Sequence, residues 1–254
     1  MSEAERSEAA FWATFLRNRN VDAGTAADGA VAVAGGYALC VAGTMLTYAV
    51  GAGSTRPLRS DDLDVVEGFY AVRGLPARFE LELETLHRDE DLFRSRGYRD
   101  EPFAAEVYAG PVVAIPPGGG IAVHRTTDRA AFCDLLVRAA AEQVHDVGIL
   151  HRSAQLNAAA AVAMVIASLD GDDVGVGALG ITGDTAILFS AAVLPAYRRR
   201  GVHTALMAAR LNLALGLGVA TALLKTEAGS PAGQSAARFG LAKVGERRRV
   251  IRET

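Results

Sequence analysis

The chain has 254 residues, half of them apolar, and a formal net charge of −3 at pH 7. This length can bury one large core or two modest ones, which indicates a compact soluble protein. The acidic N-terminal segment lacks the basic start and apolar run of a secretory signal. The longest apolar run, residues 158–167, is far shorter than the roughly 20 residues that span a bilayer. We therefore expect a cytoplasmic protein without a membrane segment.

The charge is distributed unevenly along the chain. Residues 191–254 carry a net charge of +8, whereas residues 1–190 carry −11. A basic C-terminal quarter is compatible with nucleic acid, but a phosphate-rich small ligand explains it equally well, and no interleaved aromatic residues accompany it. We therefore expect no nucleic-acid partner. Cys40 and Cys133 are far apart and lack the spacing of metal ligands, so we expect two reduced, buried thiols.

The first half of the chain alternates predicted strands and helices. An apolar strand pair is expected within residues 31–50, a helix near 62–72, a strand at 78–84, a helix to Arg96 and a final strand after Gly97-Tyr98. Glu80, Glu82 and Glu84 alternate with apolar residues, which is typical of a half-buried strand. We interpret these carboxylates as a solvated strand face.

Residues 109–120, rich in proline and glycine, are interpreted as a linker. We place a domain boundary near Pro117, which gives two domains, residues 1–117 and 118–254. After this linker we expect a short strand and then a helix capped by Asp128 and extending to about His145.

The second half continues with three strands at residues 158–169, 174–181 and 185–193, joined by tight Gly/Asp turns into an antiparallel meander. An amphipathic helix follows Gly201 and ends near Gly218. A strand at 219–226, a short helix at 234–239 and a basic last strand complete this half. The predicted order is β-α-β-β-β-α-β-α-β.

The two halves resemble each other in part. When Leu81 is aligned with Leu223, Gly97 falls within one residue of Gly240, which predicts two structurally related halves. The first half contains no Arg-x-x-Gly motif before its helix. If the halves are related, the first half has lost the turn that the second half retains.

That turn is the most informative feature of the sequence. A strand stops at Pro195, three arginines follow, and a helix begins after Gly201. The first N–H groups of a helix lack intrahelical acceptors and concentrate positive potential, so this arrangement suits a phosphate. A basic helix start that merely faces solvent is the alternative interpretation.

The segment Arg198-x-x-Gly201-x-His203, preceded by Val193-x-Pro195, resembles the acetyl-CoA signature of the GNAT superfamily of N-acetyltransferases. His203 departs from the signature, which has Gly or Ala there. Residues 237–241 resemble a second family segment. The resemblance implies a mixed α/β (α+β) fold with a mostly antiparallel central sheet flanked by helices. It covers residues 121–254, and the whole chain resembles tandem proteins with one degenerate GNAT-like half.

The resemblance also implies a cofactor site for acetyl-CoA. The strand at Ala191, Ala192 and Val193 would bulge and free an N–H for the thioester carbonyl. The pyrophosphate would lie on backbone amides in the turn, where Gly201 permits close approach. His203 has three open interpretations: an exposed side chain, a phosphate contact or a catalytic group. The implied turn residues are Arg198, Arg199, Arg200, Gly201, Val202, His203 and Thr204.

The catalytic groups are less evident than the cofactor site. The position at which the family often supplies an acid, a tyrosine, is Ala236 here, and the strand at 185–193 contains no carboxylate. Glu227 is the candidate base, although it also suits a solvated strand end. Ser230 and Ser235 suit proton donation or helix capping. The His and Asp residues lack metal-ligand spacing, so no metal is expected.

The leading hypothesis is therefore an acetyl-CoA-dependent N-acetyltransferase in which a primary amine of a small molecule or peptide attacks the thioester directly. The alternative is a non-catalytic acyl-CoA-binding or interaction module. A nucleic-acid module ranks last, and a homodimer remains open.

Overall fold

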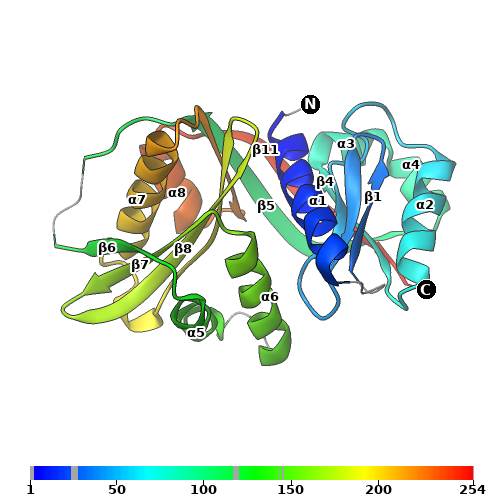
Figure 1. Ribbon diagram of the computed structural model, residues 1–254. Coiled ribbons are helices and arrows are strands. Elements are labelled where there is room, and N and C mark those ends of the chain that lie inside the picture. Colours follow the sequence, from blue (N-terminus) through cyan, green and yellow to red (C-terminus); the bar gives the residue numbers. More distant parts are fainter. Residues whose placement is uncertain (1–2, 24–27, 117–119, 143, 145, 254) are drawn as a thin grey trace. The chain divides into compact units, whose positions relative to one another are not determined.

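A computed structural model describes residues 3–23, 28–116, 120–142, 144 and 146–253. The contacts divide the chain into two compact units. Unit 1 comprises Met1–Ala42, Leu46–Val107 and Val244–Thr254, and unit 2 comprises Gly43–Met45 and Tyr108–Lys243. Each unit consists of a β-sheet with helices on its faces (Figure 1). Pro117, where the sequence suggests a boundary, lies outside the described residues.

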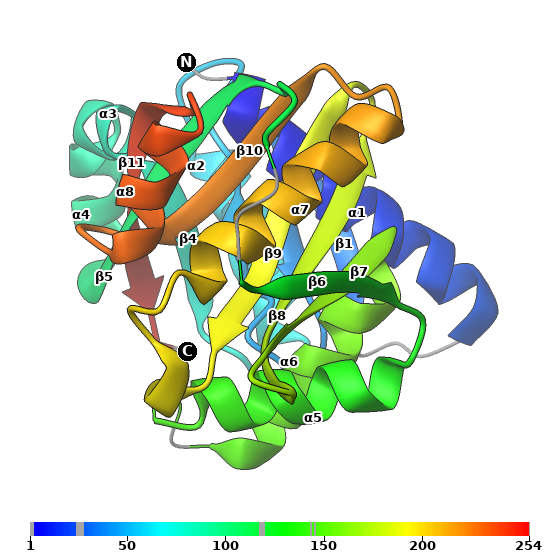
Figure 2. The same cartoon turned by 90° about the vertical axis from the view of Figure 1, so that its left-hand side faces the viewer.

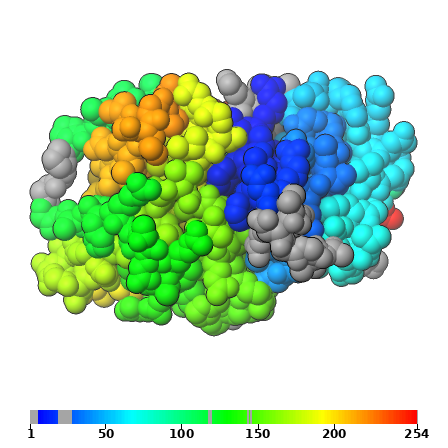
Figure 3. Space-filling model, viewed as in Figure 1, coloured from blue at the N-terminus to red at the C-terminus, as the bar shows by residue number. Residues whose placement is uncertain are grey.

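Unit 1 contains a sheet in the order β1-β2-β3-β4-β11-β5. β3 and β4 pair in parallel, whereas β1–β2, β2–β3 and β4–β11 pair antiparallel. α1 covers one sheet face and forms the surface there (dark blue in Figure 3), while α2 packs on the other face. The elements are α1 (Glu3–Ala23), β1 (Gly29–Val33), β2 (Gly36–Cys40), β3 (Thr47–Val50), α2 (Ser60–Ala71), β4 (Ala77–Glu82), α3 (Leu83–Arg88), α4 (Glu90–Ser95), β5 (Arg99–Pro111) and β11 (Ala242–Arg252).

Unit 2 contains the predicted meander within a sheet in the order β5-β10-β9-β8-β7-β6. β9 and β10 pair in parallel. Alternating residues of β7 and β8 pack on α7 from one sheet face and on α5 and α6 from the other (Figure 2). The elements are β6 (Ala122–Thr126), α5 (Arg129–Ala140), α6 (Val147–Ala160), β7 (Ala163–Leu169), β8 (Asp172–Thr182), β9 (Thr185–Val193), the 3-10 helix η1 (Pro195–Tyr197), α7 (Val202–Gly216), β10 (Thr221–Glu227) and α8 (Pro231–Arg238).

The two units repeat one order of elements, as the sequence predicts. In each, three antiparallel strands lead through a helix to a fourth strand that pairs in parallel with the third. The turns after α4 and α8 close in the same way: Tyr98 N–H donates to Phe93 O over 3.0 Å, and Leu241 N–H donates to Ala236 O over 3.1 Å. Gly97 and Gly240 adopt φ values of 76° and 79° in these turns. The predicted mixed α/β fold of two related halves is confirmed.

The last strands are exchanged between the repeats. β5, which ends the first repeat, lies beside β10 in unit 2, where Val112 N–H donates to Ala220 O over 2.8 Å. β11, which ends the second repeat, pairs with β4 in unit 1 through residues 247–252. The two repeats of the sequence therefore complete each other's sheets.

Three details differ from the predictions. The helix capped by Asp128 ends at Ala140, and a separate helix, α6, occupies residues that the sequence assigns partly to a strand. α1 was not predicted. Glu80 and Glu82 are buried, so the interpretation of a solvated carboxylate face is wrong. Glu80 accepts hydrogen bonds from Arg247 and Arg249 of β11, which alternation within one strand cannot reveal.

Candidate functional site

The turn before α7 has an unusual backbone. After η1, Arg199 adopts a φ of 62° and Gly201 a φ of 85°, both in the left-handed region. A Cβ on Gly201 would meet only Ile121 Cδ1, at 3.5 Å, so the dihedral angle rather than lack of space requires glycine here. Left-handed residues in a turn let successive N–H groups converge into an anion-binding concavity.

The N–H groups of this turn lack acceptors. Arg198 N–H donates to Pro195 O over 3.3 Å, and Ala205 N–H makes the first bond of α7, to Gly201 O, over 3.0 Å. Between them, the six N–H groups of residues 199–204 have no acceptor among the residues that the structure describes. Arg198 is thus the one predicted turn residue whose amide is already engaged. The remaining six amides form the anion cradle, residues 199–204.

The arginine side chains brace the turn. Arg198 donates from Nε to Val193 O (3.2 Å) and from Nη2 to Ala139 O (3.2 Å), so its guanidinium joins the turn to α5. Arg200 Nη2 lies 2.7 Å from Asp170 Oδ2 at the surface. The groups of this turn that stay available to an anion are therefore its amides rather than the Arg198 side chain.

The cradle adjoins two strand ends that diverge. β9 and β10 pair in register from Thr185 and Thr221 as far as Leu188 and Leu224, although β9 continues to Val193 and β10 to Glu227. Beyond these rungs, the backbone groups that β9 and β10 turn toward each other have no partners in the β9–β10 ladder.

β9 also bulges where the sequence analysis expects a bulge. Ala178 pairs with Phe189 and Val176 with Ala192, so Ser190 and Ala191 have no partners in the β8–β9 register. Ser190 adopts a φ of 51°. Such a bulge withdraws N–H groups from the ladder and re-aims them. Of the predicted residues, Ala191 lies in the bulge, whereas Ala192 and Val193 pair with Val176 and Gly175 of β8 and lie beyond the last rung that β9 shares with β10.

His203 does not simply face outward. Its Nδ1 atom is buried and has no hydrogen-bond partner among the described residues. Burial lowers the pKa of His203 to about 4, and the charge of Arg210 lowers it further in the same direction. The imidazole is therefore neutral at pH 7, so it brings no positive charge to the cradle.

The candidate catalytic residues have different surroundings. Glu227 is exposed at the end of β10, three residues beyond the last paired residue. Ser235 Oγ donates to Pro231 O over 3.1 Å, within α8. Ser230 lies at the N-cap of α8 without a capping bond from its side chain, and its Oγ lies 2.8 Å from Thr226 Oγ1. These serines bond locally.

A tyrosine that the sequence analysis missed lies against α8. Ala236 is fully buried, and Tyr108 of β5 packs in the same apolar cluster. A Cβ built on Gly233 would lie 2.5 Å from Tyr108 Oη, so the absence of a side chain there makes room for the phenol. Tyr108 comes from the first repeat, which is why spacing within the second repeat could not identify it.

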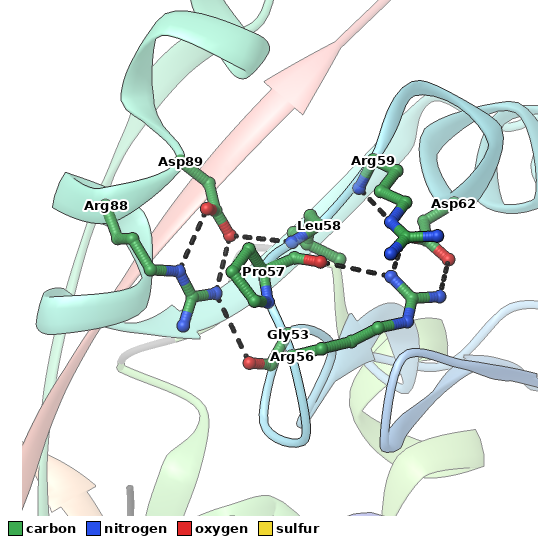
Figure 4. Close-up of polar contacts among 8 residues, drawn as sticks. All are labelled: Gly53, Arg56, Pro57, Leu58, Arg59, Asp62, Arg88 and Asp89. Atoms are coloured by element: carbon green, nitrogen blue, oxygen red, sulfur yellow. Dashed lines mark hydrogen bonds and ion pairs between the residues drawn. The ribbon is translucent and has the colours of Figure 1, made fainter.

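The corresponding turn of unit 1 is filled by the chain itself (Figure 4). Leu58 N–H donates to Asp89 Oδ2 over 3.1 Å, and Arg59 N–H donates to Asp62 Oδ2 over 2.8 Å. Arg88 Nε and Arg56 Nη2 hold these carboxylates at 2.9 and 2.7 Å, respectively. The hydrogen bond from Arg56 is the main cause of a lowered pKa at Asp62, which keeps that carboxyl ionised.

Three further N–H groups of this loop are also engaged. Gly53 and Thr55 donate to Ala34 O, and Ser54 donates to Gly51 O. Asp61 and Asp62 place negative charge in the first turn of α2, where an incoming phosphate would be repelled. Among the described residues, the first half therefore has no run of six successive unpaired amides like residues 199–204 before this helix.

Two further observations concern metal ligands and membrane spans. Within the described ranges, no group of three or more His, Cys, Asp or Glu side chains could hold a metal ion. In the same part of the chain, no helix is long and apolar enough to cross a membrane.

Comparisons with known proteins agree with this geometry. Residues 129–241 match the acetyltransferase (GNAT) family. A GCN5-related N-acetyltransferase from Kribbella flavida is 14% identical, with a TM-score of 0.69 over 100% of this chain and 97% of that chain. A tandem GNAT protein from the clavulanic acid biosynthesis pathway is 12% identical, with a TM-score of 0.61 over 99% and 95%. No curated protein sequence matches the chain.

A third structure, a GCN5-related N-acetyltransferase from Sphaerobacter thermophilus, is 17% identical, with a TM-score of 0.57 over 81% of this chain and 71% of that chain. Residues 129–241 therefore belong to the GNAT acetyltransferase family, and the whole chain has the fold of a tandem GNAT protein. The family implies acyl transfer from an acyl-CoA to a small-molecule or peptide acceptor.

Proposed function

We propose that the protein is an acetyl-CoA-dependent N-acetyltransferase that acetylates a primary amine. The observation that supports this proposal is the cradle of six unpaired amides, residues 199–204, beside the ends of β9 and β10, which no longer pair with each other. Amides at a helix N-terminus bind phosphate, and a strand-like pantetheine arm fits between two strand ends. Of the predicted cofactor residues, Arg198 contributes by bracing the turn, and the other six turn residues contribute their N–H groups.

The β9 bulge supplies the reacting end of this site. An N–H among Ala191, Ala192 and Val193 donates to the thioester oxygen and stabilises the charge that develops there. The amine nitrogen attacks the carbonyl carbon, the C–N bond forms, and the C–S bond breaks. The amine loses one proton, and the CoA thiolate takes one up.

Two residues are candidates for these proton transfers. Glu227, at the end of β10, is the candidate base, and Tyr108 is the candidate acid in place of the tyrosine missing at Ala236. We expect Glu227→Gln and Tyr108→Phe each to lower kcat by roughly 10²-fold. Tyr37→Phe in unit 1 is the matched control, and equal kcat values for the Tyr108 and Tyr37 variants would remove Tyr108 from the mechanism.

The two domains have different roles in this proposal. Residues 118–254 bind the cofactor, and residues 1–117 are a degenerate GNAT-like domain whose cradle is filled by Asp62 and Asp89. The first domain also contributes Gly43–Met45 to unit 2, where Arg152 Nε donates to Gly43 O over 2.7 Å. It therefore supports the second domain rather than binding a second cofactor.

The proposal is tested by CoA release from acetyl-CoA over a panel of amines, detected with a thiol reagent. We expect release that depends on one class of primary amine and that is absent in the Gly201→Glu variant. Acetyl-CoA binding without release for any amine would instead favour a non-catalytic acyl-CoA-binding module. Ala236 and the absence of a carboxylate from β9 are the observations that favour this second candidate.

A further inference from the structure

α7 buries a charge without a counter-charge. Arg210 is fully buried on a helix face otherwise formed by residues such as Leu206, Met207 and Leu211. Its Nε donates to Leu206 O over 3.1 Å, but it makes no ion pair with any residue that the structure describes, and Nη2 has no partner there. Burying an unpaired charge is costly, and an apolar side chain of similar volume would pack without this cost. Packing alone therefore does not explain Arg210.

The guanidinium contacts the sheet where β9 begins to bulge. Arg210 Nη1 donates to Ala178 O and to Phe189 O, each over 3.3 Å. Ala178 and Phe189 pair with each other, and theirs is the last regular rung of the β8–β9 ladder before the bulge. One positively charged group therefore holds both carbonyls at the point where pairing changes register.

A glycine makes room for this contact. A Cβ on Gly177 would lie 2.9 Å from Arg210 Nε and 3.1 Å from its Cδ. The backbone of Gly177 does not have a positive φ, so alanine fits its conformation, and the three atoms nearest to the added Cβ all belong to the Arg210 side chain. Gly177 and Arg210 form one arrangement beside the bulge.

The guanidinium remains charged in this setting. Burial lowers the pKa of Arg210 to about 10, which still leaves it protonated at pH 7. His203, two turns earlier on α7, is neutral, so the local charge stays positive. A fixed positive charge in a dry interior favours negative charge that develops nearby.

We propose that Arg210 is a positioning residue that fixes the β9 bulge so that its freed N–H stays aimed at the thioester oxygen. This inference rests on the proposed acyl transfer. Arg210 touches neither acyl group nor acceptor in this proposal. It acts through the backbone of Phe189 and through its charge.

The kinetic test compares Arg210→Met, which keeps the volume, and Arg210→Lys, which keeps the charge, with wild type. The matched control is Asn212→Ala on the same helix, which loses two hydrogen bonds to Ile115. We expect Arg210→Met to lower kcat for CoA release at least about tenfold while the Kd for CoA changes less than twofold. Arg210→Lys should recover part of the rate, and Asn212→Ala should keep it. An unchanged kcat, or a Kd that worsens in parallel with kcat, overturns the proposal.

A second test needs no turnover and separates this proposal from the proposed function. Amide hydrogen exchange is measured in the ligand-free protein at Ala178 and Phe189, with Gly180 and Ile187 as the reference rung. Gly177→Ala displaces the guanidinium but keeps its charge. In this variant, the exchange rates at Ala178 and Phe189 should rise at least about tenfold relative to those at the reference rung. Equal exchange at both rungs overturns the role of Arg210, even if the wild type transfers acyl groups. If the wild type neither binds nor cleaves acetyl-CoA but the rung of Ala178 and Phe189 responds, the proposed function fails, and only the part of the proposal in which Arg210 holds the β9 bulge stands.

Discussion

The backbone N–H of Leu58 donates to Asp89 Oδ2 over 3.1 Å. Arg59 N–H is engaged in the same manner by Asp62, so carboxylates of the chain hold amides of unit 1 whose counterparts in residues 199–204 are unpaired. Carboxylates of the chain thus occupy these amides in the first repeat, whereas the described residues leave the amides of residues 199–204 without acceptors.

This difference predicts one CoA per chain. Native mass spectrometry with excess CoA should show a single added ligand, because Asp62 and Asp89 repel phosphate and occupy the amides of unit 1. The Gly201→Glu variant should show none. A second ligand of comparable affinity would contradict the assignment of unit 1 as degenerate.

Glu80 anchors a buried ion cluster in unit 1. Its carboxylate lies 2.8 Å from Arg249 Nη2 and 3.3 Å from Arg247 Nη1, and Arg247 also pairs with Glu8 of α1. Removing one partner leaves buried charge uncompensated, so Glu80→Gln should lower the free energy of unfolding by about 3 kcal/mol. Urea denaturation checks this value, with exposed Glu84→Gln as the control. Equal urea concentrations at the unfolding midpoint for the two variants would show that the ion cluster does not stabilise the fold.

His203 gives the protein a pH-dependent stability. Its pKa is about 4 in the folded state against 6.5 ordinarily, so between these values the unfolded chain binds more protons. Stability is therefore lost as the pH falls from 6.5 through 4, by at most about 3 kcal/mol. Urea denaturation at several pH values across this range gives the free energy of unfolding at each pH. This free energy should change less steeply with pH for His203→Gln than for the exposed control His124→Gln. Identical slopes would mean that His203 is not buried in its neutral form.

Local patterns predicted much of unit 2. The Gly/Asp turns predicted the meander, and Asp128 caps α5 by accepting from Ala131 N–H over 3.0 Å. Gly218 follows α7 with a φ of 75°, as expected of a glycine that ends a helix. Each of these features depends on neighbouring residues, which one segment of sequence contains.

Features that depend on distant partners were not predictable in the same way. Glu80 alternates like a surface carboxylate, but β11 brings Arg247 and Arg249 to it from 167 and 169 residues away. Tyr108 reaches α8 because β5 joins the sheet of unit 2. Arg210 interrupts an apolar helix face, but no role for it was predicted from the sequence. Its contact with Phe189 required the fold.

The central claim is that the amides of residues 199–204 bind the pyrophosphate of acetyl-CoA, and calorimetric titration tests it most directly. Gly201→Glu and Gly218→Glu place the same side chain at φ values of 85° and 75° at opposite ends of α7, so they share backbone strain but not the cradle. The predicted result is one acetyl-CoA bound by wild type and by Gly218→Glu, with binding weakened at least about 100-fold in Gly201→Glu. Equal affinity in the two variants, or no binding by wild type, would contradict it.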